Sequence, residues 1–346
     1  MTRRVLALCL LVLPGLLVAA CGRTAAPALD VRTPTSVPTV TPVAATLTPT
    51  PSPSASPSAS ATTTPSPINT VAPSPPTTAS PTTVRTPAIA TPLLTSTPAR
   101  ASATPAADER LSRYRPGLQG TLVERVFYSA ALNRTMPYNL YLPPGYDATT
   151  RRYPVLYMLH GGGGHRDEWL GYELHQVADK AIRDGVIQPM IIVFPQGDTG
   201  YYANNAGNGP LWGDYIWRDV PTHIDAAYRT LGSARSRAIA GNSMGGWGAL
   251  SNSFLHPDVF SIAGAHSPSL PQDDGFRPVL DTGEEFQRHD PVSLARTAPG
   301  LETLYIWIDT GRDDMWVPRI NELHDALASR GIPHHWEIVA GDHDYT

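Results

Sequence analysis

The stretch RAIAGNSMGG at residues 237–246 decides how this chain folds. Its first four residues are mostly apolar and predict a strand, and Met244 to Phe254 have the periodicity of a helix. A Gly-x-Ser-x-Gly turn between a strand and a helix holds its serine out over the sheet, with glycines where a Cβ would collide with neighbouring backbone. Roughly one chain of this length in ten contains the motif by composition alone, so an ordinary glycine-rich turn is the alternative. The strand before it and the helix after it favour Ser243 as a nucleophile.

Strand-like and helix-like segments alternate through the region after residue 107. Apolar, β-branched or aromatic runs predict strands at Thr121 to Tyr128, Tyr138 to Leu142, Pro154 to Leu159, Met190 to Phe194, Arg237 to Ala240, Val259 to Ala265, Leu304 to Ile308 and Trp336 to Val339. Helical periodicity lies at Tyr172 to Asp184, Tyr215 to Thr230, Met244 to Phe254 and Trp316 to Arg330. This order predicts an α/β fold with a mostly parallel central sheet, helices on both faces and an antiparallel edge made by the earliest strands.

Reactive groups in such sheets collect at the carboxyl ends of the strands. The strand ending at Leu159 leads into HGGGG at residues 160–164. Four glycines leave backbone N–H groups unshielded, as an oxyanion site requires, and the residue after the nucleophile, Met244, supplies a second N–H. The alternative is a phosphate cradle, but no Gly-Lys-Ser/Thr follows. We interpret His160 as a structural residue rather than a base.

A serine nucleophile needs a base, and the base needs a carboxylate that fixes its tautomer. The strand ending at Ile308 leads into DTGRDD at residues 309–314, and the last strand leads into Gly341-Asp342-His343. The order Ser, Asp, His is that of α/β-hydrolases. His343 is favoured among the histidines because it follows the last strand, whereas His334 and His335 lie at that strand's other end.

The region after Leu118 resembles a family of esterases that includes feruloyl and acetylxylan esterases, S-formylglutathione hydrolase, enterochelin esterase and the antigen 85 mycolyltransferases. The resemblance rests on LYMLHGG at residues 156–162, Trp169, the nucleophile segment and GRDD at residues 311–314. It implies the α/β-hydrolase fold, Gly162 as the oxyanion donor of the glycine-rich loop, and Asp314 rather than Asp313 as the acid.

One departure from the family lies at the end of the sequence. The family continues with a C-terminal helix after the histidine, whereas this sequence stops at Thr346. We therefore expect either a truncated sequence or a domain without that helix.

The implied reaction is a two-step acyl transfer without metal or cofactor. Ser243 attacks an ester carbonyl, His343 takes its proton, Asp314 orients the imidazole, and the N–H groups of Gly162 and Met244 bind the oxyanion. Neither His160 with His165 nor the run Asp342-His343-Asp344 has the spacing of an HExxH or CxxC metal site.

Substrate recognition is predicted from aromatic residues near the serine. Trp212 and Trp217 lie in a loop from Tyr201 to Trp217, and Trp247 follows Ser243 by one helical turn. Such rings stack on a feruloyl group or a sugar, although tryptophan is also a common core residue. Three hypotheses result: an extracellular carboxylesterase acting on small-molecule or polysaccharide esters, an acyltransferase of the mycolyltransferase type, and a non-enzymatic wall-binding lipoprotein.

The N-terminal third is predicted not to fold. Arg3 and Arg4 precede an apolar run that is too short to span a bilayer and ends at Cys21, so residues 1–21 indicate a lipoprotein signal with Cys21 as the lipidated residue. Residues 22–107 form a Pro/Thr/Ser-rich tether that lacks the residues of a core. We expect an esterase domain over residues 108–346, exported and held on the outer face of the membrane.

Charge and cysteine content limit the partners. The 346 residues carry 26 Lys and Arg against 30 Asp and Glu, a net charge of −4, which argues against nucleic acid. The two cysteines, Cys9 in the signal and Cys21, leave no pair for a disulfide in a mature chain. The membrane is expected as a partner only through the lipid anchor, and the oligomeric state is not predicted.

Overall fold

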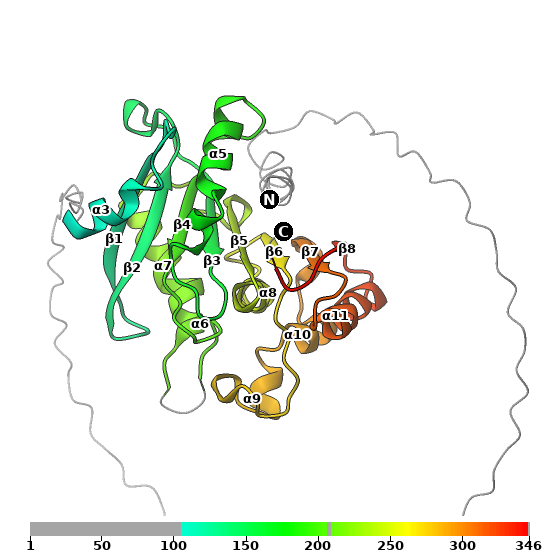
Figure 1. Ribbon diagram of the computed structural model, residues 1–346. Coiled ribbons are helices and arrows are strands. Elements are labelled where there is room, and N and C mark those ends of the chain that lie inside the picture. Colours follow the sequence, from blue (N-terminus) through cyan, green and yellow to red (C-terminus); the bar gives the residue numbers. More distant parts are fainter. Residues whose placement is uncertain (1–104, 206–208, 345–346) are drawn as a thin grey trace, which may run out of the picture. The chain divides into compact units, whose positions relative to one another are not determined.

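The computed structural model describes residues 105–205 and 209–344. These residues form one eight-stranded sheet with the order β1-β2-β4-β3-β5-β6-β7-β8 (Figure 1). The strand bounds are β1 Thr121–Ser129, β2 Arg134–Leu142, β3 Val155–Leu159, β4 Ile191–Pro195, β5 Arg237–Asn242, β6 Ile262–His266, β7 Tyr305–Gly311 and β8 His334–Val339. Strands β1 and β2 pair antiparallel with each other, β2 pairs antiparallel with β4, and all other pairs are parallel. The predicted mostly parallel sheet with an antiparallel edge is confirmed.

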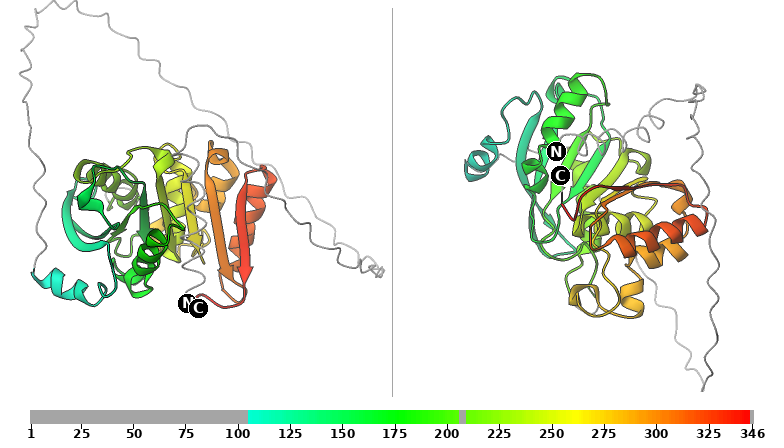
Figure 2. Two further views of the ribbon diagram at one scale, coloured as in Figure 1. Left: turned by 90° about the horizontal axis from the view of Figure 1, so that it is seen from above. Right: turned by 45° about the vertical axis from the view of Figure 1, so that its right-hand side comes forward.

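The sheet separates two apolar cores. Alternate residues of β3 point to opposite faces, so Tyr157 and Leu159 join one core while Leu156 and Met158 join the other. The larger core is covered by α7 (Val220–Ala227), α8 (Met244–Leu255), α10 (Pro291–Thr297) and α11 (Val317–Ser329) (Figure 2). The smaller core is covered by α3 (Pro105–Ser112), α4 (Glu168–Gly171) and α5 (Leu174–Arg183).

Short helices fill the connections. They are η1 (Tyr146–Ala148), α6 (Trp212–Asp214), η2 (Tyr215–Asp219), η3 (Ala234–Ser236), η4 (Pro278–Leu280), α9 (Glu284–Gln287) and η5 (Leu301–Thr303). The helix predicted over Tyr215 to Thr230 is instead a π-helical turn, η2, followed by α7, which ends at Ala227. The predicted strand at Tyr138 begins earlier, at Arg134, because it completes a hairpin with β1.

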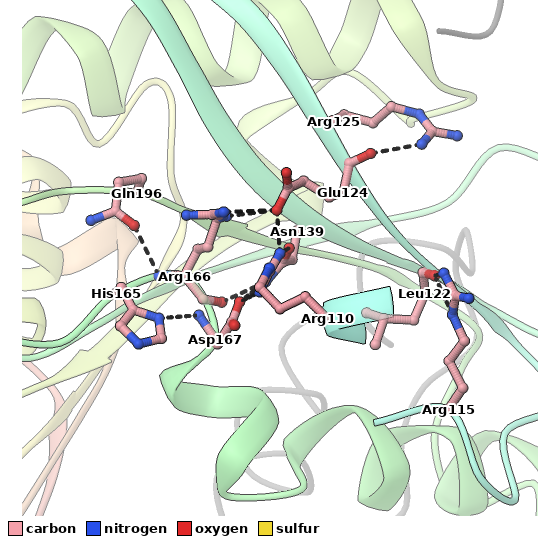
Figure 3. A network of polar contacts seen from close by, with 10 residues as sticks. All are labelled: Arg110, Arg115, Leu122, Glu124, Arg125, Asn139, His165, Arg166, Asp167 and Gln196. Atoms are coloured by element: carbon pink, nitrogen blue, oxygen red, sulfur yellow. Dashed lines mark hydrogen bonds and ion pairs between the residues drawn. The ribbon is translucent and has the colours of Figure 1, made fainter. Parts of the chain in front are cut away.

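Helix α3 is fixed to the sheet by a network of charged side chains (Figure 3). Arg110 pairs with Glu124 and Asp167 and donates a 3.0 Å hydrogen bond to Asn139. Arg166 also pairs with Glu124, at 2.8 Å. Burial alone would raise the pKa of Asp167, but the hydrogen bonds from Arg110 and Asn139 lower it below its ordinary value. The network therefore joins α3 to β1 and β2.

The expected signal sequence, Cys21 and the tether up to residue 104 lie outside the described residues. None of the helices in the described part of the chain is both long and apolar enough to span a membrane.

Candidate active site

Ser243 lies where β5 ends and α8 begins. Its backbone has φ 50° and ψ −119°, a conformation that side chains rarely adopt and that holds the residue out from both elements. A Cβ on Gly241 would lie 2.6 Å from the backbone of Gly245, and a Cβ on Gly245 would lie 2.4 Å from the carbonyl oxygen of Leu159. The predicted reason for the two glycines is confirmed, since the turn packs directly on its own backbone and on β3.

Three side chains form a continuous chain of hydrogen bonds at this point. His343 Nε2 lies 2.9 Å from Ser243 Oγ, and His343 Nδ1 lies 2.9 Å from Asp314 Oδ2. A carboxylate only accepts, so Nδ1–H donates to Asp314 and Nε2 accepts from the serine hydroxyl. The structure therefore brings together the three residues that the sequence singled out, from three segments distant in the chain.

Asp314 is prepared to orient this imidazole. Its carboxylate is buried, and it accepts hydrogen bonds from Thr310 Oγ1 at 3.1 Å and from the Trp316 amide at 2.9 Å. Burial by itself would raise the pKa of Asp314, but the hydrogen bonds from His343 and from the Trp316 amide outweigh it and lower the pKa. Asp313 is exposed and takes no part, so the carboxylate at this position is Asp314.

Two amides lie beside the serine. Gly162 lines the same cavity as Ser243, and a Cβ built on it would lie 3.9 Å from the Cβ of Met244. Met244 is the first residue of α8, where N–H groups lack intrahelical acceptors and the helix dipole favours negative charge. Within the described parts of the chain, no backbone acceptor is found for the amide of Gly162, which lies in a turn, or, outside α8, for the amide of Met244. Both N–H groups are therefore available to a developing oxyanion.

His160 is a structural residue, as predicted. It is 1% exposed; its Nδ1 lies 2.8 Å from the carbonyl oxygen of Gly161, and its Nε2 accepts from the Gly197 amide at 2.9 Å. Burial lowers its pKa, which favours the neutral ring. Both nitrogens are occupied, so His160 holds the glycine-rich loop against the end of β4. His334 and His335 contact His324 and Trp307, away from the cavity.

A cavity of about 250 Å³ opens beside Ser243. Its lining combines the triad serine and histidine, the oxyanion loop, an aromatic pair and several polar side chains. They are Gly161, Gly162, Glu168, Trp169, Tyr172, Asn242, Ser243, His266, Ser267, Asp309, His343 and Asp344. Trp169 and Tyr172 pack edge to face with ring centroids 6.0 Å apart and form the aromatic wall.

The sequence predicted that Trp212, Trp217 and Trp247 bind substrate, but the structure places none of them at the cavity beside Ser243. Trp247 is fully buried in the larger core, and Trp212 packs there against Tyr215. Trp217 stacks on His256 with centroids 4.0 Å apart. Trp212 begins α6, Trp217 lies in η2 and Trp247 lies in α8, and these elements direct the three rings toward the larger core.

The cavity also contains residues that the sequence analysis did not select. His266 and Asp309 stand at the ends of β6 and β7, and Tyr172 precedes α5. A signal for the first two was present, because each directly follows a predicted strand. In residues 105–205 and 209–344, no three His, Cys, Asp or Glu side chains are grouped as metal ligands.

Comparison with known proteins agrees with this architecture. Residues 129–346 match a family model described as "Putative esterase". This is more than half of the chain, so the protein belongs to the esterase family of α/β-hydrolases.

Individual relatives show how far the likeness extends. Esterase Rv1288 of Mycobacterium tuberculosis is 30% identical over 260 residues, which cover 63% of this chain and 54% of that protein. An endo-1,4-beta-xylanase/feruloyl esterase of Xylanibacter ruminicola is 30% identical over 170 residues, covering 46% of this chain and 23% of that one. A solved ferulic acid esterase is 26% identical, with a TM-score of 0.59, and covers 66% of this chain and 92% of its own. This chain thus spans about half the length of the first of these curated relatives.

Proposed function

We propose that this protein is a serine carboxylesterase with Ser243 as nucleophile, His343 as base and Asp314 as the acid that orients it. The observation that carries the proposal is the pair of 2.9 Å contacts that link the serine hydroxyl to a buried carboxylate through one imidazole. The family and its named esterases support the same reaction class.

The geometry gives each group one task. His343 Nε2 takes the hydroxyl proton as Ser243 Oγ attacks the ester carbonyl, and Asp314 stabilises the imidazolium that forms. The N–H groups of Gly162 and Met244 donate to the oxyanion of the tetrahedral intermediate. His343 then gives its proton to the departing alcohol oxygen, leaving an acyl-enzyme. Water, activated by the same imidazole, attacks this ester and releases the acid and the free serine.

The size and lining of the cavity indicate a small acyl group. About 250 Å³ is at the low end of ligand sites, which span roughly 300–1,000 Å³. A short or single-ring acid fits this space beside the aromatic wall of Trp169 and Tyr172. Feruloyl and other small-acid esters are therefore the proposed substrates, in line with the relatives named feruloyl esterases.

An acyltransferase would use the same three residues, and product analysis separates it from a hydrolase. Adding trehalose or glycerol to the reaction of a hydrolase should leave free acid as the main product. A transferase would instead move the acyl group to the added alcohol faster than to water.

The proposed location is the outer face of the membrane, with Cys21 lipidated and the Pro/Thr/Ser-rich residues before α3 as the tether. The support is the sequence alone: an export signal that ends in small residues before Cys21. A Cys21→Ala variant should lose its N-terminal lipid in mass spectrometry and leave the membrane fraction. Retention of that variant in the membrane fraction would contradict the anchor.

The test of the activity is hydrolysis of p-nitrophenyl acetate and methyl ferulate by the purified protein. Ser243→Ala should lower kcat by about 10⁴- to 10⁶-fold. Ser253→Ala is the matched control, because it removes a hydroxyl from the same helix at a site where the hydroxyl donates to the carbonyl of Leu250. An unchanged rate in Ser243→Ala, or an equal loss in the control, would overturn the proposal.

A further inference from the structure

The cavity holds a second histidine–carboxylate pair that the proposed mechanism does not use. His266 Nδ1 lies 2.7 Å from Asp309 Oδ1. Asp309 Oδ2 in turn accepts a 2.8 Å hydrogen bond from the indole N–H of Trp307. Both His266 and Asp309 line the cavity beside Ser243.

The sheet fixes this pair next to the nucleophile. His266 is the register partner of Asn242 on β5 and of Asp309 on β7, so the three residues form one row across neighbouring strands. The Ser243 amide donates to the carbonyl oxygen of His266 at 2.9 Å. The row therefore begins one residue from the serine and runs across the sheet edge that carries the cavity.

The hydrogen bonds determine which nitrogen of His266 faces a ligand. Asp309 accepts through both oxygens, so Nδ1 of a neutral His266 carries the proton and Nε2 is an acceptor. Among the described residues, the Nε2 atom of His266 has no hydrogen-bond partner. This atom is also not fully buried. An oriented acceptor is thus presented to the cavity.

The joining of β6 to β7 does not by itself explain why the side chains of His266 and Asp309 form a hydrogen bond. The backbone already joins β6 to β7, because the Ser267 amide donates to the carbonyl oxygen of Asp309 at 2.7 Å. Keeping a carboxylate at 13% side-chain exposure costs desolvation that apolar residues would avoid. The cavity wall beside Ser243 therefore presents the Nε2 acceptor of His266 to a hydrogen-bond donor.

The aromatic wall indicates which kind of substrate group carries the hydrogen-bond donor for His266. Trp169 lies against His266 with ring centroids 6.0 Å apart, and Tyr172 stands next to Trp169. A flat or pyranose ring that packs on these residues places a ring substituent near Nε2. Hydroxyl groups are the hydrogen-bond donors that such rings carry.

We propose that His266 is a substrate-binding residue whose Nε2 accepts a hydrogen bond from a ring hydroxyl of the ester, and that Asp309 is a positioning residue that fixes its tautomer. This inference rests on the proposed esterase function and names the chemistry that its site selects. The hydroxyl belongs either to a phenolic acyl group or to a sugar alcohol, and two substrate pairs separate these sources.

The experiment compares kcat/KM within each pair for the wild type and for two variants. Methyl p-coumarate against methyl cinnamate tests the phenol, and an acetylated methyl xyloside against cyclohexyl acetate tests the sugar. His266→Asn keeps an amide for Asp309 but withdraws the Nε2 acceptor, so the preference for the hydroxylated ester should fall about 3- to 10-fold in one pair, chiefly through KM. His266→Gln reaches the Nε2 position with an amide oxygen and should restore part of the preference.

A spectroscopic measurement tests the positioning residue. In Asp309→Asn the amide oxygen can still accept from Trp307, which turns the NH₂ group toward His266 Nδ1 and moves the ring proton to Nε2. NMR of protein with labelled histidine should show this change of tautomer for the signal that disappears in His266→Asn. The preference for the hydroxylated ester should fall with it.

The outcomes separate the two claims. If the wild type hydrolyses the esters and both ratios are unchanged in His266→Asn, this inference is overturned while the proposed function stands. If the wild type hydrolyses p-nitrophenyl acetate but none of the four esters, this inference alone is overturned, whereas failure on p-nitrophenyl acetate, methyl ferulate and all four esters overturns both. An unchanged His266 tautomer in Asp309→Asn would contradict the role of Asp309.

Discussion

Two histidine–carboxylate pairs face the same cavity, and their difference shows what each is suited to do. His343 with Asp314 and His266 with Asp309 have similar contacts, at 2.9 Å and 2.7 Å. In the first pair the outer nitrogen meets Ser243 Oγ at 2.9 Å. In the second pair, His266 lines the cavity and its outer nitrogen has no hydrogen-bond partner among the described residues. The same two residue types therefore support a reacting group in one place and a binding surface in the other.

The two carboxylates also differ in their exposure to solvent and in their hydrogen bonds. The side chain of Asp314 is 0% exposed, whereas that of Asp309 is 13% exposed. Asp314 accepts from a backbone amide and a threonine hydroxyl, while Asp309 accepts from an indole. A buried and fully hydrogen-bonded carboxylate stabilises an imidazolium more strongly than a partly exposed one. Only His343, with Asp314 as its partner, is therefore placed to hold the hydroxyl proton of Ser243 during the reaction.

Removing the negative charge of each carboxylate in turn should show the largest difference between the two pairs. Asp314→Asn should lower kcat on p-nitrophenyl acetate by about 10⁴-fold, because the imidazole loses the partner that fixes its tautomer and stabilises its charge. Asp309→Asn should lower it by less than about 10-fold, since that pair lies outside the proton path. Steady-state kinetics of the two variants measures the difference. Equal losses would mean that the two pairs have been assigned the wrong roles.

The position of Ser243 between the pairs depends on close backbone packing. Gly245→Ala would place a Cβ 2.4 Å from the carbonyl oxygen of Leu159, so β3 and α8 must separate. We expect a loss of about 1–3 kcal/mol in the free energy of unfolding. Gly171→Ala is the matched control, because its Cβ would meet nothing within 4 Å, and its change should stay within about 1 kcal/mol. Urea unfolding of both variants tests this, and similar losses would contradict the packing argument.

The lowered pKa of Asp314 makes its contribution to stability depend on pH. A carboxylate whose pKa is lower in the folded than in the unfolded protein stabilises the fold above its ordinary pKa of 3.8, and this contribution is lost as the pH falls through the folded value. The stability difference between wild type and Asp314→Asn should therefore shrink as the pH falls from about 5 through 3.8 and below. Urea midpoints across this range measure it, with the exposed Asp313→Asn as control. A difference that grows on acidification would contradict the stated sign.

The smallest effect is expected at a tryptophan outside the cavity. Trp217 stacks on His256 and does not line the site, so Trp217→Phe should change kcat/KM for methyl ferulate by less than about 2-fold. Trp169→Phe, at the cavity wall, should change it more, because the wall loses area and an indole that donates to the carbonyl of Leu159 at 2.8 Å. Kinetics of both variants compares them. A larger loss at Trp217 would restore the original prediction for that residue.

The sequence predicted the sheet because its strands carry their own signal. Runs such as Ile239 and Ala240 are apolar on both faces, which is typical of parallel strands between two helical layers, and the order of strands and helices is confirmed. The placement of Ser243, His343 and Asp314 was also accessible, because each follows a recognisable strand end. Their roles in catalysis stay predictions until the variants are measured.

The walls of the cavity were harder to predict. Trp212, Trp217 and Trp247 lie close to the serine in sequence, but the period of α8 and the turn of α6 direct Trp212 and Trp247 into the core. Trp169 and His266 become neighbours only through the pairing of β3, β5 and β6, with α4 folded back over the sheet edge. Contacts of this kind depend on tertiary packing, for which a single sequence contains no local pattern.

The most direct test of the account is to locate the covalent adduct of a fluorophosphonate probe. The probe phosphonylates only a serine whose proton is removed by a neighbouring base. Mass spectrometry of the digested protein should find one adduct, on Ser243, formed in the wild type and far more slowly in His343→Ala. An adduct on another residue, or esterase turnover by a protein that the probe does not modify at Ser243, would contradict the central claim.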